Sequence, residues 1–177
     1  KVVAHFTLGA VGIDIEVDPG TGRILVNKVC AGYDVGKAIT PINIKGQIEG
    51  GTVQGLSACL MEGLSYDERG RLLNPDFTDY KIATIMDAPT EIESFWEEVP
   101  EEISPYGNRG VGEHSMIAPA PALNNALFKA TGMRIHSYPL SRERVHKALK
   151  AKEKGETDFW EWPYELDLAY MRAKEER

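Results

Sequence analysis

The stretch Gly12-Ile13-Asp14-Ile15-Glu16-Val17-Asp18-Pro19-Gly20-Thr21-Gly22 alternates apolar and acidic residues and then ends in a cluster of turn formers. Successive side chains of a β-strand point to opposite faces, so its apolar residues would share one buried face. Residues 18–22 favour a tight turn, and the alternation resumes at Ile24 and Val26. Residues 11–30 therefore predict a β-hairpin.

Composition narrows the function classes. The chain has 177 residues with 42% hydrophobic and 27% charged residues, which is ordinary for a globular protein of one domain or two small ones. A net charge of -7 argues against a nucleic-acid partner. No apolar run approaches the about 20 residues of a membrane span, and the start lacks a signal-peptide pattern. We expect a cytoplasmic protein with no membrane partner and, because the sequence does not begin with Met, one piece of a larger assembly.

Cys30 and Cys59 are the two cysteines of the sequence. We expect both to be small core residues rather than a disulfide framework. Two thiolates cannot supply the four ligands of an iron–sulfur cluster. Any electron relay is therefore expected on another chain or on a missing part of this one.

Apolar residues at helical spacing predict a helix from Gln47 to Leu64, after a structured loop over residues 34–46. Gly50, Gly51 and Gly55 each weaken such a helix by about 1 kcal/mol relative to Ala. A glycine cluster of this kind indicates that something packs closely against the backbone. Either a neighbouring helix or a cofactor at the helix N-terminus would fit.

The later elements are predicted from their own local signals. Residues 90–99 favour a strand, residues 118–131 a helix closed by Gly132, and residues 133–138 a short strand. Ser141 is expected to cap a last helix, with a hydrophobic staple between Leu140 and Val145. Together these elements predict an α+β fold with a mixed or antiparallel sheet packed against helices.

The composition changes after Lys150. Residues 152–156 are charged and read as a solvated linker, and the residues beyond them are aromatic and acidic. We divide the chain into a domain of residues 1–150 and a tail of residues 151–177. The tail is expected to dock on the domain or on a partner.

Two short glycine-rich motifs carry the candidate chemistry: Gly46-Gln47-Ile48-Glu49-Gly50-Gly51 and Arg109-Gly110-Val111-Gly112-Glu113. Each places polar side chains among glycines that let backbone approach a ligand closely. A glutamate in such a loop can serve as a general base. More commonly, a glutamate at such a place only stabilises the start of a helix. Neither motif therefore decides the function alone.

Seven blocks in this order resemble the large, molybdenum-binding subunit of the xanthine dehydrogenase/aldehyde oxidase family. The resemblance extends from about residue 6 to residue 149. The blocks are residues 18–22, 34–36, 40–41, 47–51, 74–81, 109–113 and 118–130. The resemblance implies the fold of the C-terminal portion of the molybdopterin-binding domain. The chain would be either a fragment of the large subunit or a separate, split subunit.

The resemblance also implies the site residues. Glu113 matches the catalytic base of the family, and Gln47 matches the glutamine that hydrogen-bonds the pterin. Val111 and Gly112 match positions whose backbone lies against the cofactor. The implied cofactor is molybdenum–molybdopterin in its dinucleotide form, and no residue of this chain is implied as a metal ligand. His5, His136 and His146 show no ligand spacing.

The implied activity is that of a molybdopterin-dependent oxidoreductase. It would insert a water-derived oxygen into an electron-poor carbon of an N-heterocycle, such as a purine, or of an aldehyde. The implied partners are the remaining part of the molybdenum subunit, an iron–sulfur subunit, an FAD subunit and the small-molecule substrate. Two electrons would leave through iron–sulfur centres to FAD. No counterpart of the family's substrate-holding Arg and Glu is visible, so we expect the chain alone to be inactive.

Departures from the family pattern leave the substrate open. Thr40 stands before Pro41 where many relatives have Asn. His114 and Ser115 follow Glu113 where the xanthine-oxidising branch has Pro-Pro and aldehyde oxidases have a Ser-Gly-like pair. His114 could line the substrate pocket or cap the next helix turn. The alternative function is a non-catalytic assembly or docking module of the same family.

Overall fold

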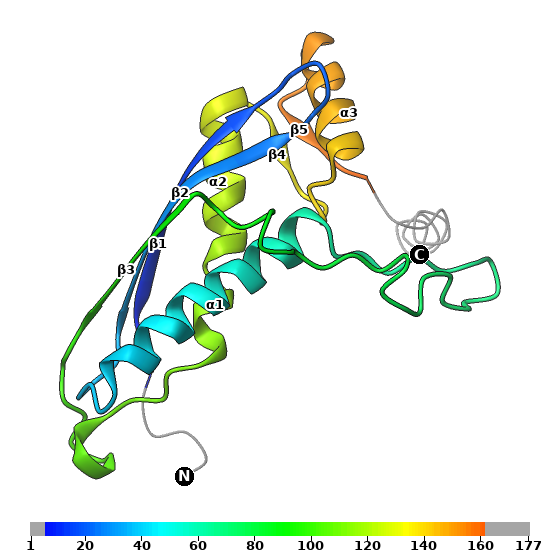
Figure 1. The fold of residues 1–177 in the computed structure, drawn as a ribbon. Coiled ribbons are helices and arrows are strands. Elements are labelled where there is room, and N and C mark those ends of the chain that lie inside the picture. The colour runs from blue at the N-terminus through cyan, green and yellow to red at the C-terminus, as the bar shows by residue number, and fades with distance from the viewer. Residues whose placement is uncertain (1–5, 162–177) are drawn as a thin grey trace, which may run out of the picture.

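A three-stranded mixed sheet forms one layer of the molecule. The computed structural model describes residues 6–161. Strands β1 (Gly9–Val17) and β2 (Ile24–Asp34) form an antiparallel hairpin, and β3 (Glu91–Glu97) pairs with β2 in parallel. The strand order is β1-β2-β3 (Figure 1). This mixed sheet with its helices confirms the predicted fold class, and the hairpin is confirmed at its expected place.

The hairpin turn is held by the side chain of Asp18. Its carboxylate accepts hydrogen bonds from the Gly20 backbone N–H at 2.9 Å and from the Thr21 hydroxyl at 2.6 Å. These bonds stabilise the charged form and lower the pKa of Asp18. The Asp18 backbone N–H donates to the carbonyl of Arg23 at 2.9 Å, which closes the turn. The tight turn predicted for residues 18–22 is thus confirmed.

A β-bulge lets two parts of β2 bury the same face. Asp14 pairs with Lys28, but Ile15 pairs with Val26, so Asn27 is the extra residue. Val26 and Val29 are both buried as a result, although a regular strand would place them on opposite faces. The Asn27 amide donates to Asp14 and Glu16 on the outer face.

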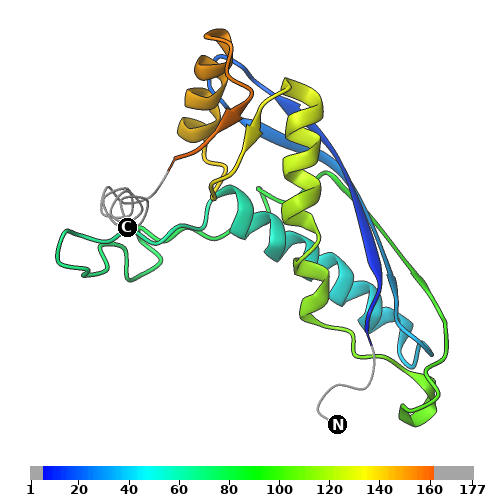
Figure 2. The same cartoon turned by 180° about the vertical axis from the view of Figure 1, so that it is seen from behind.

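Helices α1 (Pro41–Leu60) and α2 (Pro119–Thr131) cover one face of the sheet (Figures 1 and 2). The apolar residues of β1 and β2 alternate toward these helices, and the core lies between the two layers. Its most completely buried side chains include Val29 and Val35 from the sheet side and Ile48, Leu123 and Leu127 from the helices.

Helix α1 begins and ends earlier than the sequence analysis expected. It starts at Pro41 instead of Gln47, with Thr40 at its N-cap and the proline at the first helical position. Proline suits that position because its fixed φ is helical and its missing N–H would have no partner there. The helix ends at Leu60, and Leu64 is 52% exposed. The expected loop over residues 34–46 is therefore shorter than predicted.

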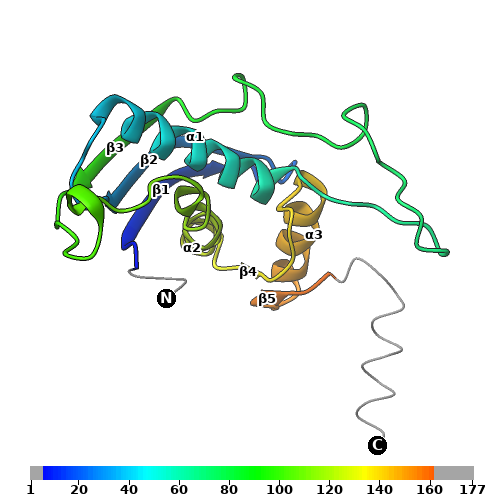
Figure 3. The ribbon, with the colours of Figure 1, turned by 90° about the horizontal axis from the view of Figure 1, so that it is seen from below.

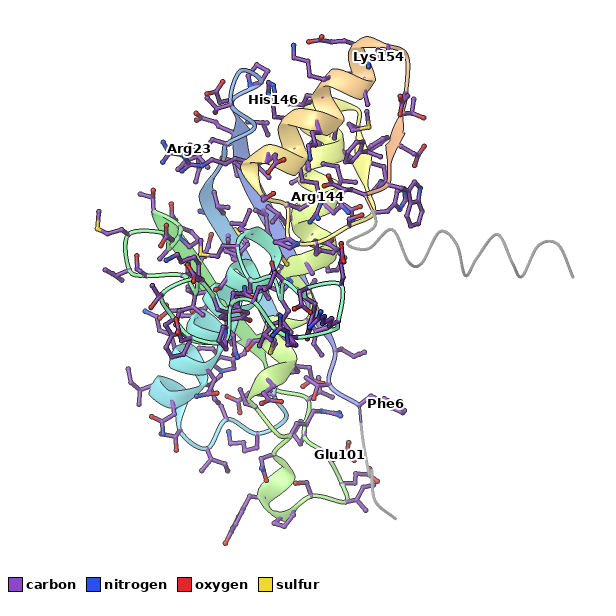
Figure 4. All side chains as sticks on the ribbon, turned by 90° about the vertical axis from the view of Figure 1, so that its right-hand side faces the viewer. Phe6, Arg23, Glu101, Arg144, His146 and Lys154 are labelled. Atoms are coloured by element: carbon purple, nitrogen blue, oxygen red, sulfur yellow. The ribbon has the colours of Figure 1, made fainter. Side chains whose placement is uncertain are left out.

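The C-terminal elements follow the prediction closely. Gly132 closes α2 with a φ of 69°, and the Ser141 hydroxyl caps α3 (Arg142–Glu153) by accepting from Arg144 N–H. Leu140 and Val145 are both buried, as a hydrophobic staple requires. Helix α3 lies beside the hairpin turn, where Figure 4 shows Arg23 near His146. The charged segment expected as a linker begins inside α3.

A two-stranded parallel sheet joins the first residues of the tail to the domain. Strand β4 (Arg134–Ile135) lies within the segment expected to be a short strand, and it pairs with β5 (Asp158–Phe159). The imidazole of His136 stacks on Trp160 with ring centroids 4.1 Å apart. The aromatic tail beyond Glu161 lies outside the described residues.

Residues 61–90 leave the end of α1 and project away from the sheet before returning to β3 (Figures 1 and 3). An Asp67-centred turn and the Tyr66–Leu72 bridge order the tip of this projecting segment. Glu62 accepts hydrogen bonds from Ser57 and Tyr80, which fix its base to α1. Within residues 6–161, no helix has the length and apolar character needed to cross a membrane.

Candidate cofactor-binding and catalytic site

The second motif is anchored to the end of β2. The Arg109 backbone N–H donates to the Val35 carbonyl at 2.9 Å, and the Lys37 N–H donates to the Gly107 carbonyl at 2.7 Å. Gly36 has a φ of 62°, and a Cβ there would press on the backbone of residues 107–109. The loop that precedes Glu113, including the 3-10 turn η1 (Pro105–Gly107), therefore cannot slide along the sheet.

The Arg109 side chain points inward and ties three segments together. Its guanidinium forms ion pairs with Asp34 and Glu101, each at 3.1 Å, and donates to the Phe6 carbonyl at 2.7 Å. Phe6 and Glu101 lie at the same end of the molecule in Figure 4. With side-chain exposures of 12–16% for these three charged groups, the cluster is largely shielded from solvent. Arg109 is thus an anchor of the motif rather than a free cation.

Glu113 begins the short 3-10 helix η2 (Glu113–Met116), directly after the two glycines of the motif. Its side chain is exposed, and within residues 6–161 its carboxylate has no hydrogen-bond or ion-pair partner. A Cβ on Gly110 or Gly112 would meet no atom within 4 Å. The carboxylate therefore stands at an open surface that glycines keep clear.

Ser115 joins the two motifs. Its hydroxyl lies 3.0 Å from the Gln47 carbonyl in α1 and 2.9 Å from the Gly112 carbonyl. The Tyr33 hydroxyl donates to the Ser115 carbonyl at 3.2 Å. In the sequence, Ser115 stands out only as a departure from the family pattern, and no local signal indicates this role. The structure thus brings the segments of Gln47 and Glu113, far apart in sequence, into direct contact.

The glycines of α1 divide into two groups. A Cβ on Gly51 would overlap the Ser115 side chain, and one on Gly55 would overlap the Met116 carbonyl. These two glycines admit η2, so a neighbouring helix explains them. Gly46 and Gly50 face open space, with no atom within 4 Å of an added Cβ, and only this second group leaves room for a ligand.

Gln47 lies in the second turn of α1, with its side chain exposed. Because Thr40 occupies the N-cap, Gln47 does not cap the start of the helix. A cofactor at Gln47 would likewise contact the side of α1 and not its N-terminus. The Gln47 amide makes no hydrogen bond within the described part of the chain.

A cleft of about 200 Å³ opens beside Gln47. Polar and apolar residues from the loop after β2, the first two turns of α1 and the second motif surround it. Its lining includes Lys37, Thr40, Asn43, Gln47, Arg109 and Val111. Of the residues predicted to contact the cofactor, Gln47 and Val111 line this cleft, whereas Gly112 and the predicted base Glu113 do not.

His114 has a structural contact on its inner side. Its Nδ1 accepts a hydrogen bond from the Gly112 N–H at 3.2 Å, and its ring meets Tyr33 edge-on at 4.9 Å between centroids. Burial lowers the pKa of the imidazole. The structure shows a third role beside the two left open for His114: the imidazole caps neither η2 nor α2 and instead braces the backbone just before Glu113.

Comparisons with known proteins identify the family of the chain. Residues 1–89 match the family model described as the molybdopterin cofactor-binding domain. The chain is 37% identical over 148 residues to the nicotine 6-hydroxylase large subunit of Paenarthrobacter nicotinovorans, covering 82% of this chain and 18% of that protein. It is 33% identical over 140 residues to the xanthine dehydrogenase molybdenum-binding subunit of Escherichia coli O157:H7, covering 78% of this chain and 18% of that protein.

A solved structure shares the fold. The aldehyde oxidoreductase of Desulfovibrio desulfuricans superposes with a TM-score of 0.73 and 30% identity, over 80% of this chain and 15% of that one. The chain thus spans about a fifth of the length of the relatives it matches. On the family match and these relatives, the chain belongs to the molybdopterin cofactor-binding domain family, as found in the molybdenum-binding subunits of xanthine dehydrogenases and aldehyde oxidoreductases.

Proposed function

We propose that this chain supplies the general base and part of the cofactor cradle of a molybdenum hydroxylase. The observation that carries the proposal is the contact between the two motifs. Ser115 bonds to the Gln47 carbonyl, while the side chains of Gln47 and Glu113 both remain open. The contact places two open polar side chains on adjoining segments, as binding of one extended ligand by both would require.

The residues present fit a pterin. A pterin is a flat heterocycle with donors and acceptors along its edge, and its recognition needs amides that are not already paired. The Gln47 amide is unpaired within the described residues, and a cleft lies beside it. Gly46, Gly50, Gly110 and Gly112 leave their surroundings clear, so that a ligand could approach the backbone there.

Each candidate residue has a distinct part in this proposal. The Gln47 amide would hydrogen-bond the pterin, and the backbone of Val111 and Gly112 would lie against the cofactor. When bound, the cofactor, proposed as the dinucleotide form, would supply the redox centre for inserting a water-derived oxygen into an electron-poor carbon. The Glu113 carboxylate would take up the proton released in that reaction, which is the work of a general base. N-heterocycles and aldehydes are the proposed substrate classes.

The remaining part of the molybdenum subunit is the proposed first partner, because this chain spans only 18% of its relatives. The projecting segment supports that proposal. Its apolar side chains are exposed along much of its length, including Leu73, Phe77, Ile85 and Met86. Exposed apolar patches mark contact surfaces. Iron–sulfur and FAD chains are proposed as further partners that carry the two electrons away.

Replacing Glu113 with Gln in the assembled enzyme tests the function. The amide keeps the size of the side chain but cannot accept the proton, so kcat is expected to fall by about 100-fold or more, with unchanged folding. Glu143→Gln is the matched control, since Glu143 has a side-chain exposure of 77% and lies on α3, outside both motifs and the projecting segment. Equal turnover in the Glu113 and Glu143 variants would refute the proposal.

The alternative is a non-catalytic assembly module, and the exposed apolar surface of the projecting segment favours it as much as it favours the enzyme. The Glu113→Gln variant separates the two, because assembly has no need of a carboxylate at that place. If the variant assembles and turns over normally, the module interpretation stands.

A further inference from the structure

We propose that Ser115 is a positioning residue, which holds the Glu113 carboxylate at a fixed place relative to the helix that carries Gln47. The inference rests on the proposed function and names a residue to which neither motif assigns a role. Ser115 is fully buried, so it does not touch a ligand itself. It acts through the backbone on either side of Glu113.

The hydroxyl of Ser115 lies between the two motifs. A hydroxyl has one hydrogen to donate, and the acceptors within reach are the carbonyls of Gln47 at 3.0 Å and Gly112 at 2.9 Å. One carbonyl belongs to the residue proposed to contact the pterin, and the other to the residue just before Glu113. This one hydroxyl therefore links the backbone of Gln47 to the backbone just before Glu113.

The side chain of Ser115 also fits the surface of α1. Gly51 stands one helical turn after Gln47, and its missing Cβ leaves the space that the Ser115 side chain fills. The serine is thus held by shape as well as by its hydrogen bonds. A displacement of η2 along α1 would drive it into the helix backbone.

Neighbouring side chains fix the backbone around Ser115. Tyr33 donates from β2 to the Ser115 carbonyl, and His114 Nδ1 accepts from the Gly112 N–H. The backbone is thereby fixed both before and after Glu113, while its carboxylate stays free. A reacting group held in this way keeps its geometry without losing its reactivity.

Ser57 offers a matched control within the same helix. Its hydroxyl is also buried, and it lies 2.5 Å from the Glu62 carboxylate and accepts from the Ala83 N–H. Removing it takes away a buried hydroxyl of α1 without touching either motif. A purely structural role of Ser115 would make Ser115→Ala and Ser57→Ala behave alike.

The first measurement is hydrogen–deuterium exchange on the full chain. Ser115→Ala is expected to speed exchange of the amides of residues 110–116, and Ser57→Ala is expected to leave them unchanged. Tyr33→Phe, which removes only the bond to the Ser115 carbonyl, should act in the same direction and more weakly. This readout does not depend on cofactor loading. Unchanged exchange at residues 110–116 in the Ser115 variant would overturn the proposal.

The second measurement is a double-mutant cycle in the assembled enzyme. Displacement of a catalytic group by about 1 Å can cost on the order of 100-fold, so Ser115→Ala is expected to lower kcat by 10- to 100-fold while KM changes little. If Ser115 acts through Glu113, Ser115→Ala should have no further effect on kcat in the Glu113→Gln background. An equal fall in both backgrounds would refute the inference.

The two proposals fail in different ways. A Glu113→Gln variant with normal turnover refutes the proposed function whatever Ser115 does. A Glu113→Gln variant that is inactive, together with a Ser115→Ala variant that retains full turnover, refutes only the role of Ser115.

Discussion

Gly51 and Ser115 occupy complementary positions: the serine side chain fills the space where any other residue at position 51 would carry its Cβ. We therefore expect Gly51→Ala to destabilise the fold by about 1–3 kcal/mol, the usual cost of forcing extra atoms into a packed contact. The helix propensity of alanine would offset only about 1 kcal/mol of that cost. Urea unfolding of the chain measures the change.

The neighbouring glycine provides the control. Gly50 lies in the same helix, but its missing Cβ faces open space. Gly50→Ala is therefore expected to stabilise the chain by about 0.5–1 kcal/mol. In the assembled enzyme the same variant should lower the molybdenum content if the cofactor passes close to this face of α1. Equal effects of both substitutions on unfolding would contradict the division of the glycines into two groups.

Arg109 is expected to be essential for the shape of the second motif. Arg109→Met removes the partner of Asp34 and Glu101 together, and it leaves two carboxylates with side-chain exposures of 12% and 16% without their ion pair. Removing one member of a buried pair costs about 3–5 kcal/mol, and partial exposure reduces this to roughly 3 kcal/mol. The free energy of unfolding in urea tests the prediction.

Arg71 is the appropriate comparison for Arg109. It also forms an ion pair, at 2.7 Å with Asp67, but its side chain is 74% exposed. Solvent-exposed pairs contribute about 0–1 kcal/mol, so Arg71→Met should change stability very little. If both variants lose the same stability, the Arg109 cluster does not anchor the loop before Glu113.

Local signals predicted much of this fold. The Asp18 turn, the Gly132 cap and the Leu140–Val145 staple each depend on residues a few positions apart, and all three form as expected. The start of α1 was also encoded locally, by Thr40 before Pro41. The predicted loop over residues 34–46 includes these two residues and misses that signal.

The hydrogen bond between Ser115 and Gln47 has no such local signal. It joins residues 68 positions apart, and nothing in the periodicity of either segment indicates which faces meet. The glycines of α1 did indicate that something approaches the helix, but not that η2 is what approaches. The site residues themselves came from the family resemblance and from motif order, which carry information that local propensity lacks.

Stability should depend on the charge of His114. Burial lowers the pKa of this residue in the folded chain below its ordinary 6.5, so the unfolded state binds more protons. Its contribution is therefore fully present above about pH 6.5 and is lost as the pH falls toward the folded pKa. His114→Phe keeps the ring edge against Tyr33 but does not titrate. Urea unfolding between pH 7.5 and 5 should show a smaller loss in the variant, and equal losses would contradict the assignment.

The projecting segment should be needed for assembly but not for folding. Ile85 and Met86 are 87% and 88% exposed, so replacing both with Asp removes apolar surface without disturbing the core. If residues 61–90 dock on the remaining part of the molybdenum subunit, co-expression with that part should yield much less complex, while the variant chain unfolds at the same urea concentration. Arg69→Asp, in the same segment, adds an acidic group without removing apolar surface and should assemble normally. Normal assembly of the double variant would place the interface elsewhere. The chain alone could instead form a concentration-dependent dimer. Loss of that dimer in the double variant would show that the segment binds a second copy of the chain.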